Sequence, residues 1–306
     1  MHKVFIDGSA GTTGLKIVER LSSRKDLSLI ILPEDLRKDI GARKEAINQA
    51  DIAFLCLPDA AAIEAVSLAS DKVKIIDTST AHRTNPSWAY GFAELEGLRE
   101  KIINSNRIAN PGCHASGFIS LVYPLVKAGL ISKDENLTCF SLTGYTGGGK
   151  KMIAEYESQD RPTLFDAPRQ YGLSQSHKHL PEMSKICSLN TLPLFCPIVA
   201  DFPQGMEVTV PLFKSQVKGT IEDIKEIYKG VYNGKIVKYC ENADEGGLLS
   251  ASSMANRDDM EISVFGNEDR ILLVSRFDNL GKGASGAAIQ NMNVILGIEE
   301  TTGLNI

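Results

Sequence analysis

A single cysteine, Cys113, stands between a tight turn and a long apolar segment in RIANPGCHASGFISLVYPLV (107–126). The apolar segment predicts a buried helix, and Pro124 must either kink this helix or lie near its end. Asn-Pro-Gly at 110–112 then places the cysteine at the helix start, where exposed N–H groups and the helix dipole favour an anion. Because the thiolate is the nucleophilic form of cysteine, this position could serve covalent catalysis. The alternative is a small thiol that fills the core. His82 and His114 could both lie near a catalytic thiol at this position.

The segment QSHKHLPEM (175–183) offers acid–base groups for such a thiol. His177 and His179 are two residues apart, so an extended backbone would place both imidazoles on one face. Glu182 follows and could orient one of them. The same pair could bind a metal, but a third ligand of suitable spacing is lacking. We expect His179 to be the acid–base group and His177 to contact the substrate, with the reverse assignment left open.

Three glycines, Gly8, Gly11 and Gly14, follow the first strand-like segment in DGSAGTTG (7–14). The pattern is G-x-x-G-x-x-G, a variant of the dinucleotide-binding G-x-G-x-x-G. Glycines let the backbone turn tightly and approach a pyrophosphate, and the N–H groups of the following helix point at the anion. Hydroxyl donors in the loop are Ser9, Thr12 and Thr13. We predict a dinucleotide site here; a glycine-rich turn without a ligand is the alternative.

The choice of nucleotide depends on LIILPEDLRK (29–38), where the second strand ends. An acidic residue at that end would bind the ribose hydroxyls and exclude a 2′-phosphate. Here Glu34 and Asp35 come late, and Arg37 and Lys38 follow at once. We therefore predict NADP (NADPH) over NAD, against the alternative of a solvated charged loop.

Strand-like and helix-like segments alternate over the first hundred residues. The predicted strands are 3–7, 27–32, 51–57 and 72–79, and the predicted helices are 13–21 and 59–69. Nearly continuous apolar strands between helices indicate a parallel sheet covered on both faces, as in the doubly wound Rossmann-like α/β pattern. In the first helix, Leu15, Val18 and Leu21 have helical spacing and are expected to face the core.

The pattern changes after about residue 113. The segment 206–213 alternates as a half-buried strand, 221–232 is an amphipathic helix, and 261–266 with 270–278 reads as an antiparallel pair. These predict an α+β catalytic domain with a mostly antiparallel sheet. The tail 281–298 is a small-residue helix that we expect to return to the first domain. The expected boundaries are 1–113, completed by 282–306, for the dinucleotide-binding domain and 114–281 for the catalytic and dimerisation domain.

The composition is ordinary for a globular protein: of 306 residues, 43% are hydrophobic and 23% charged, and the net charge is −5 at pH 7. The basic residues form no stripe, so a nucleic-acid partner is not expected. No signal peptide or membrane-length apolar run is found, which predicts a cytoplasmic protein without a membrane partner. The six cysteines form no CxxC pair and predict neither a zinc site nor disulfides.

Over nearly its whole length, the chain resembles the shorter type of the N-acetyl-γ-glutamyl-phosphate reductase family. The segments that carry this resemblance are DGSAGTTG, IIDTSTAHR, NPGCHASG, TGYTGGGKKMIAEYE, HKHLPEM, PIVADFPQGMEVTVP and GKGASGAAIQNMN. It implies an NADPH-dependent reductase of arginine biosynthesis that converts N-acetyl-glutamyl phosphate to N-acetyl-glutamate semialdehyde and phosphate through a cysteine thioester. The longer type carries Ser-Ala-Asp-Phe-Arg where this chain has STAHR, so only Ser79 and Arg83 carry over there.

The expected site follows from the motifs and this resemblance together. The expected catalytic residues are Cys113, His179 and His177. The expected cofactor contacts are Gly8, Ser9, Gly11, Thr12, Thr13, Gly14, Arg37, Pro58, Ser79 and Asn279. The expected substrate contacts are Arg83, Asn110, Ser116, Gly148, Lys150 and Glu182. No metal is expected.

Two other functions and the assembly are open at this point. An aspartate-semialdehyde dehydrogenase would use the same chemistry on a different acyl phosphate, and a non-catalytic NADP-binding sensor would keep only the fold. The intact cysteine and histidine set argues against the sensor. The sheet of the second domain could pair between subunits, and we expect a homodimer or homotetramer.

Overall fold

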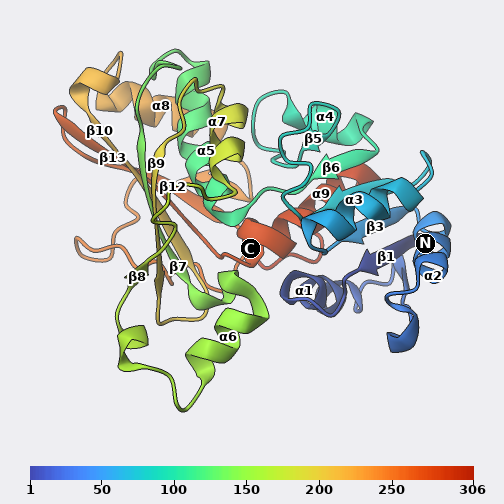
Figure 1. Cartoon of the computed structure of the whole chain (residues 1–306). Helices are drawn as coiled ribbons and strands as arrows, with labels where there is room; N and C mark the ends of the chain where they lie inside the picture. Colours follow the sequence, from blue (N-terminus) through green and yellow to red (C-terminus); the bar gives the residue numbers. More distant parts are fainter. The chain divides into compact units, whose positions relative to one another are not determined.

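The computed structural model describes residues Met1–Ile306 and divides into two compact units (Figure 1). The first unit consists of Met1–Ala93, Gly97–Pro111 and Ala284–Leu304. The second unit consists of Glu94–Glu96, Gly112–Gly283 and Asn305–Ile306. Each unit is built around its own sheet, and each is described separately below.

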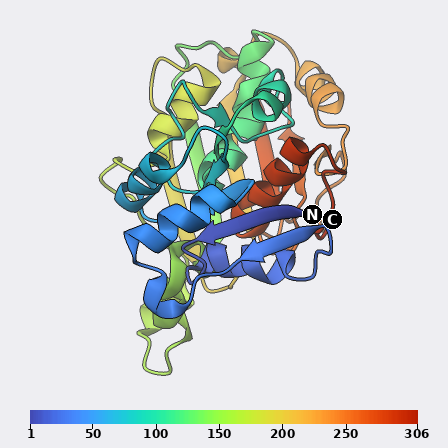
Figure 2. The same cartoon turned by 90° about the vertical axis from the view of Figure 1, so that its right-hand side faces the viewer.

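A six-stranded parallel sheet forms the centre of the first unit (Figure 2). Its strands are β1 (His2–Asp7), β2 (Leu27–Ile30), β3 (Ile52–Leu55), β4 (Lys74–Asp77), β5 (Ala89–Tyr90) and β6 (Arg107–Ala109). Their order is β2-β1-β3-β4-β6-β5, and every pair is parallel. The predicted doubly wound sheet is therefore confirmed.

Helices cover both faces of this sheet, because successive strand residues point to opposite sides. The helices are α1 (Thr12–Leu21), α2 (Ile40–Gln49), α3 (Asp59–Leu68), α4 (Leu98–Asn104) and α9 (Gly286–Leu296), with a short 3₁₀ turn η1 (Glu34–Leu36). Val4 and Ile6 pack in one cluster with residues of α1, α4 and α9. Phe5 packs in the other cluster with residues of α2 and α3.

The predicted buried face of the first helix is confirmed at Leu21, which is buried, and at Val18, which packs against the core, but it is wrong at Leu15. Gly14, Ile17 and Leu21 are the buried residues of α1, whereas Leu15 is 49% exposed. The stripe includes a glycine, which a hydrophobic pattern does not detect, and this shifts the apparent face of the helix.

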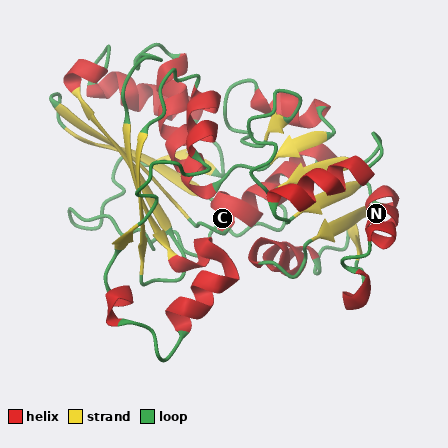
Figure 3. Cartoon of the chain, viewed as in Figure 1, coloured by secondary structure: helices red, strands yellow, loops and turns green.

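A seven-stranded mixed sheet forms the centre of the second unit (Figure 3). Its strands are β7 (Thr138–Gly144), β8 (Arg169–Gln170), β9 (Leu194–Ala200), β10 (Met206–Phe213), β11 (Val237–Tyr239), β12 (Met260–Gly266) and β13 (Arg270–Phe277). Their order is β11-β12-β13-β10-β7-β9-β8. The pairs β11–β12 and β7–β9 are parallel and the other four pairs are antiparallel, in line with the predicted mostly antiparallel sheet.

The helices of the second unit pack on one face of its sheet (Figures 1 and 3). They are α5 (Cys113–Lys127), α7 (Leu180–Cys187) and α8 (Ile221–Val231), and α6 (Gly149–Glu157) follows β7 and the turn η2 (Tyr145–Gly148). Two further 3₁₀ turns are η3 (Thr163–Asp166) and η4 (Lys214–Gln216). Helix α5 approaches β10 closely at Gly117, where a methyl group would lie 2.3 Å from the Val208 side chain. Glycine at this position therefore fixes the depth at which α5 lies on the sheet.

The opposite face of this sheet carries exposed apolar side chains. Strand alternation buries one set of residues under α5 and leaves Phe140 of β7, Leu194 of β9 and Leu272 of β13 between 42% and 54% exposed. An apolar sheet face of this kind is typical of a surface that a partner covers. We call this set of side chains the open sheet face.

The chain leaves β13 through a short π-helical segment, η5 (Gly281–Ser285), which runs directly into α9. Ala288, Ile289 and Met292 of α9 are fully buried in the core of the first unit. No helix of the structure is both long enough and apolar enough to span a bilayer.

Candidate active site

Cys113 is the first residue of α5, and Gly112 before it is extended (φ −78°, ψ 147°). The N–H of Ser116 donates to Gly112 O at 2.8 Å and closes the first helical turn. The N–H groups of this turn have no acceptor within the helix, so the helix start favours a negative charge. The thiol is partly exposed. A partly exposed cysteine at a helix N-terminus is the arrangement that supports a reactive thiolate.

Gly283 of the π-helical segment contacts the nucleophile. A methyl group at this position would lie 3.1 Å from Cys113 Cβ and 3.0 Å from the backbone oxygen of Asp278. The absence of a side chain therefore lets η5 lie against Cys113. Short π-helical segments are frequent at functional sites, where they place backbone close to a reactive group.

Three histidine rings form one cluster in the second unit. The centroids of His177 and His179 are 4.8 Å apart, and that of His114 is 5.7 Å and 5.6 Å from them. The backbone is not extended here, because Lys178 and His179 form a turn that leads into α7. The N–H of His179 donates to Nδ1 of His177 at 3.2 Å, so the proton of a neutral His177 lies on Nε2.

Glu182 binds the backbone beside the nucleophile. Its carboxylate Oε1 accepts the N–H of Gly112 at 2.8 Å, and the residue is 1% exposed. The orientation of an imidazole by Glu182, which the sequence suggested, stays a prediction beside this contact. The contact joins the first turn of α7 to the start of α5, and a carboxylate at a helix N-terminus is itself favoured by the dipole. Glu182 thereby fixes the distance between the histidine segment and the cysteine.

His114 has a hydrogen bond at each ring nitrogen. Its Nδ1 is 2.6 Å from Oγ of Ser141 on β7, and its Nε2 is 2.6 Å from the hydroxyl oxygen of Tyr171, which follows β8. The ring of Phe195 packs against it with a centroid distance of 5.3 Å. Sequence reasoning missed Tyr171 and Ser141, because they lie 57 and 27 residues from His114 and carry no local motif.

Burial fixes the charge states in this cluster. Burial, with a smaller effect of His177, lowers the pKa of His114 to about 3. Burial and the neighbouring Lys178 lower the pKa of His177. Burial and the charge of Cys113 raise the pKa of Tyr171. At neutral pH His114 is therefore a neutral imidazole and Tyr171 keeps its proton.

Stability is expected to fall in acid partly because of His114. A histidine in the unfolded chain titrates near pH 6.5, whereas the buried His114 resists protonation down to about pH 3. Between these values the unfolded state binds a proton that the folded state excludes, so the free energy of unfolding decreases by up to about 1.4 kcal/mol per pH unit. His114→Gln removes this contribution, and urea unfolding between pH 4 and 7 measures the difference. Parallel curves for the two proteins would show that folded His114 is protonated.

The glycine loop of the first unit allows a close approach of the backbone. Gly8 has φ +81°, and a methyl group there would lie 2.2 Å from Cys56 O; at Gly14 it would lie 2.4 Å from Gly8 O. Gly11 precedes α1, and its N–H donates to Gly8 O. Side chains are thus excluded where a pyrophosphate would approach the start of α1. The residues present fit a dinucleotide.

The other expected cofactor contacts of the first unit follow neighbouring strands. Arg37 is exposed after β2 and η1, Pro58 is the residue before α3 after β3, and Ser79 follows β4. Because β2, β1, β3 and β4 are adjacent and parallel, these segments follow the same edge of the sheet as the glycine loop. The chain leaves β1 for β2 on one side and returns to β3 on the other, which is the switch point where such sheets bind ligands.

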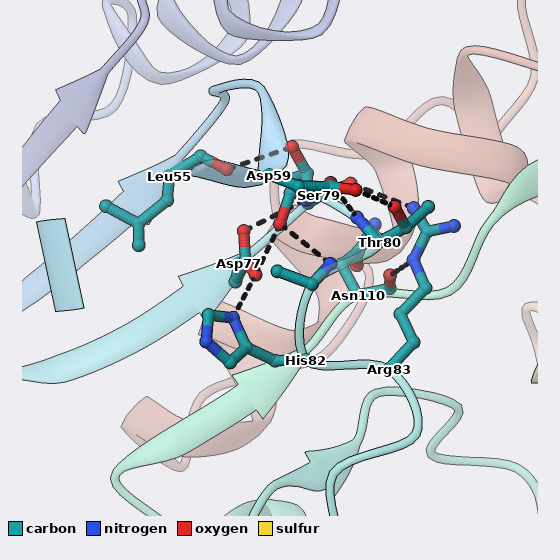
Figure 4. Close-up of polar contacts among 10 residues, drawn as sticks. Leu55, Asp59, Asp77, Ser79, Thr80, His82, Arg83 and Asn110 are labelled. Carbon is teal, nitrogen blue, oxygen red and sulfur yellow. Dashed lines mark hydrogen bonds and ion pairs between the residues drawn. The ribbon is translucent and has the colours of Figure 1, made fainter. Parts of the chain in front are cut away.

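A buried carboxylate organises the loop after β4 (Figure 4). Asp77 accepts the N–H of Ser79 at 2.9 Å and its hydroxyl at 2.7 Å, and Nδ1 of His82 lies 2.6 Å from the same carboxylate. The ring of His82 stacks on Trp88 with a centroid distance of 4.0 Å. Asp77 therefore holds Ser79 and His82 in one rigid loop.

Arg83 binds backbone carbonyl groups (Figure 4). Its Nε donates to Asn110 O at 2.9 Å and its Nη2 to Thr78 O at 2.8 Å. Asn110 in turn donates from Nδ2 to Ala284 O. The guanidinium thus ties the loop after β4 to the turn that precedes Cys113 in the chain.

Two family models match the chain. The semialdehyde dehydrogenase NAD binding domain matches residues 3–105, and the semialdehyde dehydrogenase dimerisation domain matches residues 113–279. The chain belongs to the semialdehyde dehydrogenase family. The glycine loop lies in the NAD binding domain of the family, and Cys113 and the histidine cluster lie in its dimerisation domain.

Curated relatives and solved structures extend this assignment. The chain is 46% identical to proteins named N-acetyl-gamma-glutamyl-phosphate reductase from Brucella ovis and Brucella canis, over 96% of this chain and 99% of each relative. Its fold is that of aspartate semialdehyde dehydrogenase II from Vibrio cholerae, with a TM-score of 0.73, 16% identity and coverage of 97% and 98% of the two chains. The enzyme from Francisella tularensis gives a TM-score of 0.71 at 15% identity, with coverage of 97% and 100%.

The remaining expected contacts lie in the semialdehyde dehydrogenase dimerisation domain. Asn279 is 1% exposed; its Oδ1 accepts the N–H of Gly205 and its Nδ2 donates to Oγ1 of Thr146. Ser116 is buried in the first turn of α5. Gly148 and Lys150 are exposed at the start of α6. Asn279 therefore holds the turn before α6, whereas Gly148 and Lys150 are accessible to a ligand.

Proposed function

We propose that the chain reduces N-acetyl-glutamyl phosphate to N-acetyl-glutamate semialdehyde and phosphate with NADPH, a step of arginine biosynthesis. The observation that carries the proposal is Cys113 at the start of α5, joined through Glu182 to the segment that holds His177 and His179. The reductase name of relatives at 46% identity supports the substrate. The exposed Arg37 after β2 supports NADPH over NADH, because a guanidinium can bind a 2′-phosphate.

The first half of the proposed reaction is acyl transfer. The Cys113 thiolate attacks the carbonyl carbon of the acyl phosphate, the bond to the phosphate oxygen breaks, and phosphate leaves with the electron pair. The product is a thioester on Sγ. Backbone N–H groups at the start of α5 stabilise the oxyanion of the tetrahedral intermediate. The helix start thus favours the thiolate before attack and the oxyanion after it.

The second half is reduction and release. NADPH, when bound, supplies the hydride that converts the thioester to a thiohemiacetal oxyanion. His179 protonates this oxygen and then removes the same proton as the carbon–sulfur bond breaks, which gives the aldehyde and the thiolate. His177, with its proton on Nε2, is a donor to the substrate.

The six expected substrate contacts form three pairs in this proposal. Arg83 donates to Asn110 O and Glu182 accepts the N–H of Gly112, and both hydrogen bonds position the turn before Cys113. Lys150 and the Gly148 backbone bind the phosphate at the exposed start of α6. Asn110 and Ser116 lie within three residues of Cys113 in the sequence and stay predicted substrate contacts.

Steady-state kinetics in the reverse direction test the proposal. The assay contains N-acetyl-glutamate semialdehyde, phosphate and either NADP or NAD, and follows the reduced nucleotide by absorbance. We expect phosphate-dependent turnover with NADP at a kcat/KM at least about tenfold above that with NAD. Aspartate semialdehyde is the second candidate substrate, because aspartate semialdehyde dehydrogenase II from Vibrio cholerae shares the fold. Higher kcat/KM with aspartate semialdehyde would refute the proposed substrate.

The open sheet face of the second unit is proposed to pair two copies of the chain into a homodimer. Phe140 lies between Cys196 and Thr209 in register, and Leu272 lies opposite Pro211, so the exposed apolar side chains form neighbouring rows. The matched family model is named for dimerisation and spans this sheet. Burial of this apolar face in a dimer would stabilise the dimer by about 25 cal/mol for each Å² of apolar surface removed from water.

Phe140→Glu combined with Leu272→Glu is expected to convert the dimer to a monomer. Each substitution would bury an unpaired charge in an apolar interface, which costs several kcal/mol. Sedimentation velocity at micromolar concentration measures the mass. Leu15→Glu is the matched control, since Leu15 is 49% exposed on α1 of the first unit and should leave the mass unchanged. A dimer that survives the double substitution would contradict the proposed interface.

A further inference from the structure

Ser141, His114 and Tyr171 form a chain of hydrogen bonds that ends beside the nucleophile. Ser141 is 0% exposed and His114 is 4% exposed, and both bonds of the chain are 2.6 Å long. Tyr171 is only partly buried, its hydroxyl oxygen lies 2.6 Å from Nε2 of His114, and His114 directly follows Cys113 at the start of α5. This series of hydrogen bonds therefore extends from the core of the sheet toward the start of α5, where the thiol lies.

The direction of these bonds follows from the hydroxyl of Ser141. A buried hydroxyl left without an acceptor costs about 1–3 kcal/mol, so its proton has to be donated. Nδ1 of His114 is its hydrogen-bond partner in the structure, and it accepts only if it carries no proton. A neutral imidazole then carries its proton on Nε2 and donates it to the oxygen of Tyr171.

This direction determines what Tyr171 can do. Its oxygen already accepts a hydrogen bond from His114, so its own proton is free to be donated to a second acceptor. The opposite tautomer would make Tyr171 donate to Nε2 and would leave no proton for the site. A hydrogen bond accepted from His114 also polarises the phenol and strengthens it as a donor.

We propose that His114 is a positioning residue: as the Nε2–H tautomer set by Ser141, it orients the Tyr171 hydroxyl as a hydrogen-bond donor toward the Cys113 sulfur and the acyl oxygen bound there. The part that concerns the acyl oxygen rests on the proposed function, whereas the tautomer and the effect on the thiol do not. Tyr171 thereby adds a side-chain donor to the N–H groups of the helix start.

The tautomer can be measured directly. With ¹⁵N-labelled histidine, two-bond proton–nitrogen correlations identify which nitrogen of each of the five imidazoles carries the proton, and His114→Gln assigns the signal. We expect His114 to be the neutral Nε2–H tautomer at pH 6, and Ser141→Ala to convert part of it to the Nδ1–H form. An Nδ1–H tautomer or a protonated ring in the wild type would overturn the proposal.

The effect on the thiol is measured by alkylation of Cys113 against pH, followed by mass spectrometry of its peptide. The titratable side chains in this cluster are Glu182, His114, His177, His179 and Tyr171. Tyr171→Phe and His114→Leu each remove the oriented donor, and we expect the alkylation midpoint to rise by about half to one pH unit. His114→Gln keeps an amide N–H that can donate to Tyr171, so the midpoint should rise at most half as much as in His114→Leu.

The matched control is Tyr228→Phe. Tyr228 donates a hydrogen bond from its hydroxyl to Leu121 O of the same helix α5. The substitution removes a buried phenol hydroxyl and leaves the hydrogen bonds among Ser141, His114 and Tyr171 intact. It should leave the midpoint unchanged. An equal shift in this control, or no shift in Tyr171→Phe, would show that the effect is structural and would overturn the proposal.

Kinetics separate this inference from the proposed function. With N-acetyl-glutamate semialdehyde, Tyr171→Phe and His114→Leu should each lower kcat about 10- to 100-fold with KM changed less than about threefold, and the double variant should lose no more than either single one. Shifted alkylation without activity toward this substrate in the wild type would refute the proposed function alone. Wild-type activity with normal kcat and midpoint in Tyr171→Phe would refute this inference alone.

Discussion

Cys113→Ser is expected to lower phosphate-dependent NADP reduction to less than about one thousandth of the wild-type rate. Serine has nearly the size of cysteine, so the turn at Gly112 and the bond from Glu182 should persist. The helix start assists the ionisation of a thiol, but it is too weak to ionise a hydroxyl near neutral pH. Without a thiolate no thioester forms, and the hydride has no acceptor.

The measurement is the reverse assay together with a nucleotide titration of the same variant. Binding of NADP should stay within about twofold of wild type, because its predicted contacts are chiefly the glycine loop and the strand ends of the first unit. Cys240→Ser is the matched control: this cysteine is also partly exposed, but burial raises the pKa of its thiol. Full activity of Cys113→Ser, or its loss in the control, would remove the nucleophile assignment.

His179→Asn is expected to lower kcat about 10²- to 10⁴-fold, the usual range for loss of a general acid–base group. Asparagine keeps hydrogen-bonding capacity but cannot exchange a proton near neutral pH, so breakdown of the thiohemiacetal becomes slow. The pH profile of kcat should lose one limb in this variant. Thioester formation does not need this proton, so mass spectrometry of the variant mixed with the acyl phosphate in the absence of NADPH should still show the acylated Cys113.

His177→Asn is the comparison variant. His177 lies 4.8 Å from His179 between ring centroids, but the N–H of His179 occupies its Nδ1. As a substrate contact, it should mainly raise KM and keep both limbs of the pH profile. The reverse result, with the lost limb in His177→Asn, would exchange the two roles.

Much of the fold could be predicted from periodicity. The alternation in 206–213 gave the bounds of β10 without error, and the continuous apolar runs gave the parallel strands β1 to β4. Strand β5 has two residues and α2 has three buried residues among charged ones, so neither has a pattern long enough to detect. Their positions depend on tertiary contacts with the neighbouring strand or helix.

The site could be predicted only where the chemistry is local in the chain. The helix start at Cys113 and the paired imidazoles follow from short motifs. The bond from Glu182 to Gly112 spans 70 residues and that from Tyr171 to His114 spans 57, so no spacing rule indicates them. In particular, the sequence alone would assign His114, next to an apolar run, to the core. Only the structure shows Ser141 and Tyr171 at its two ring nitrogens.

The hydrogen bond between Glu182 and the Gly112 N–H bears on hybrid enzymes made by segment exchange among relatives. Glu182 is three residues from His179, and Gly112 is one residue from Cys113. Two short segments joined by one hydrogen bond therefore set the spacing between the histidine and the cysteine. A swap of either segment alone would join donor and acceptor from different parents. Such hybrids should stay active only when both segments come from the same parent enzyme.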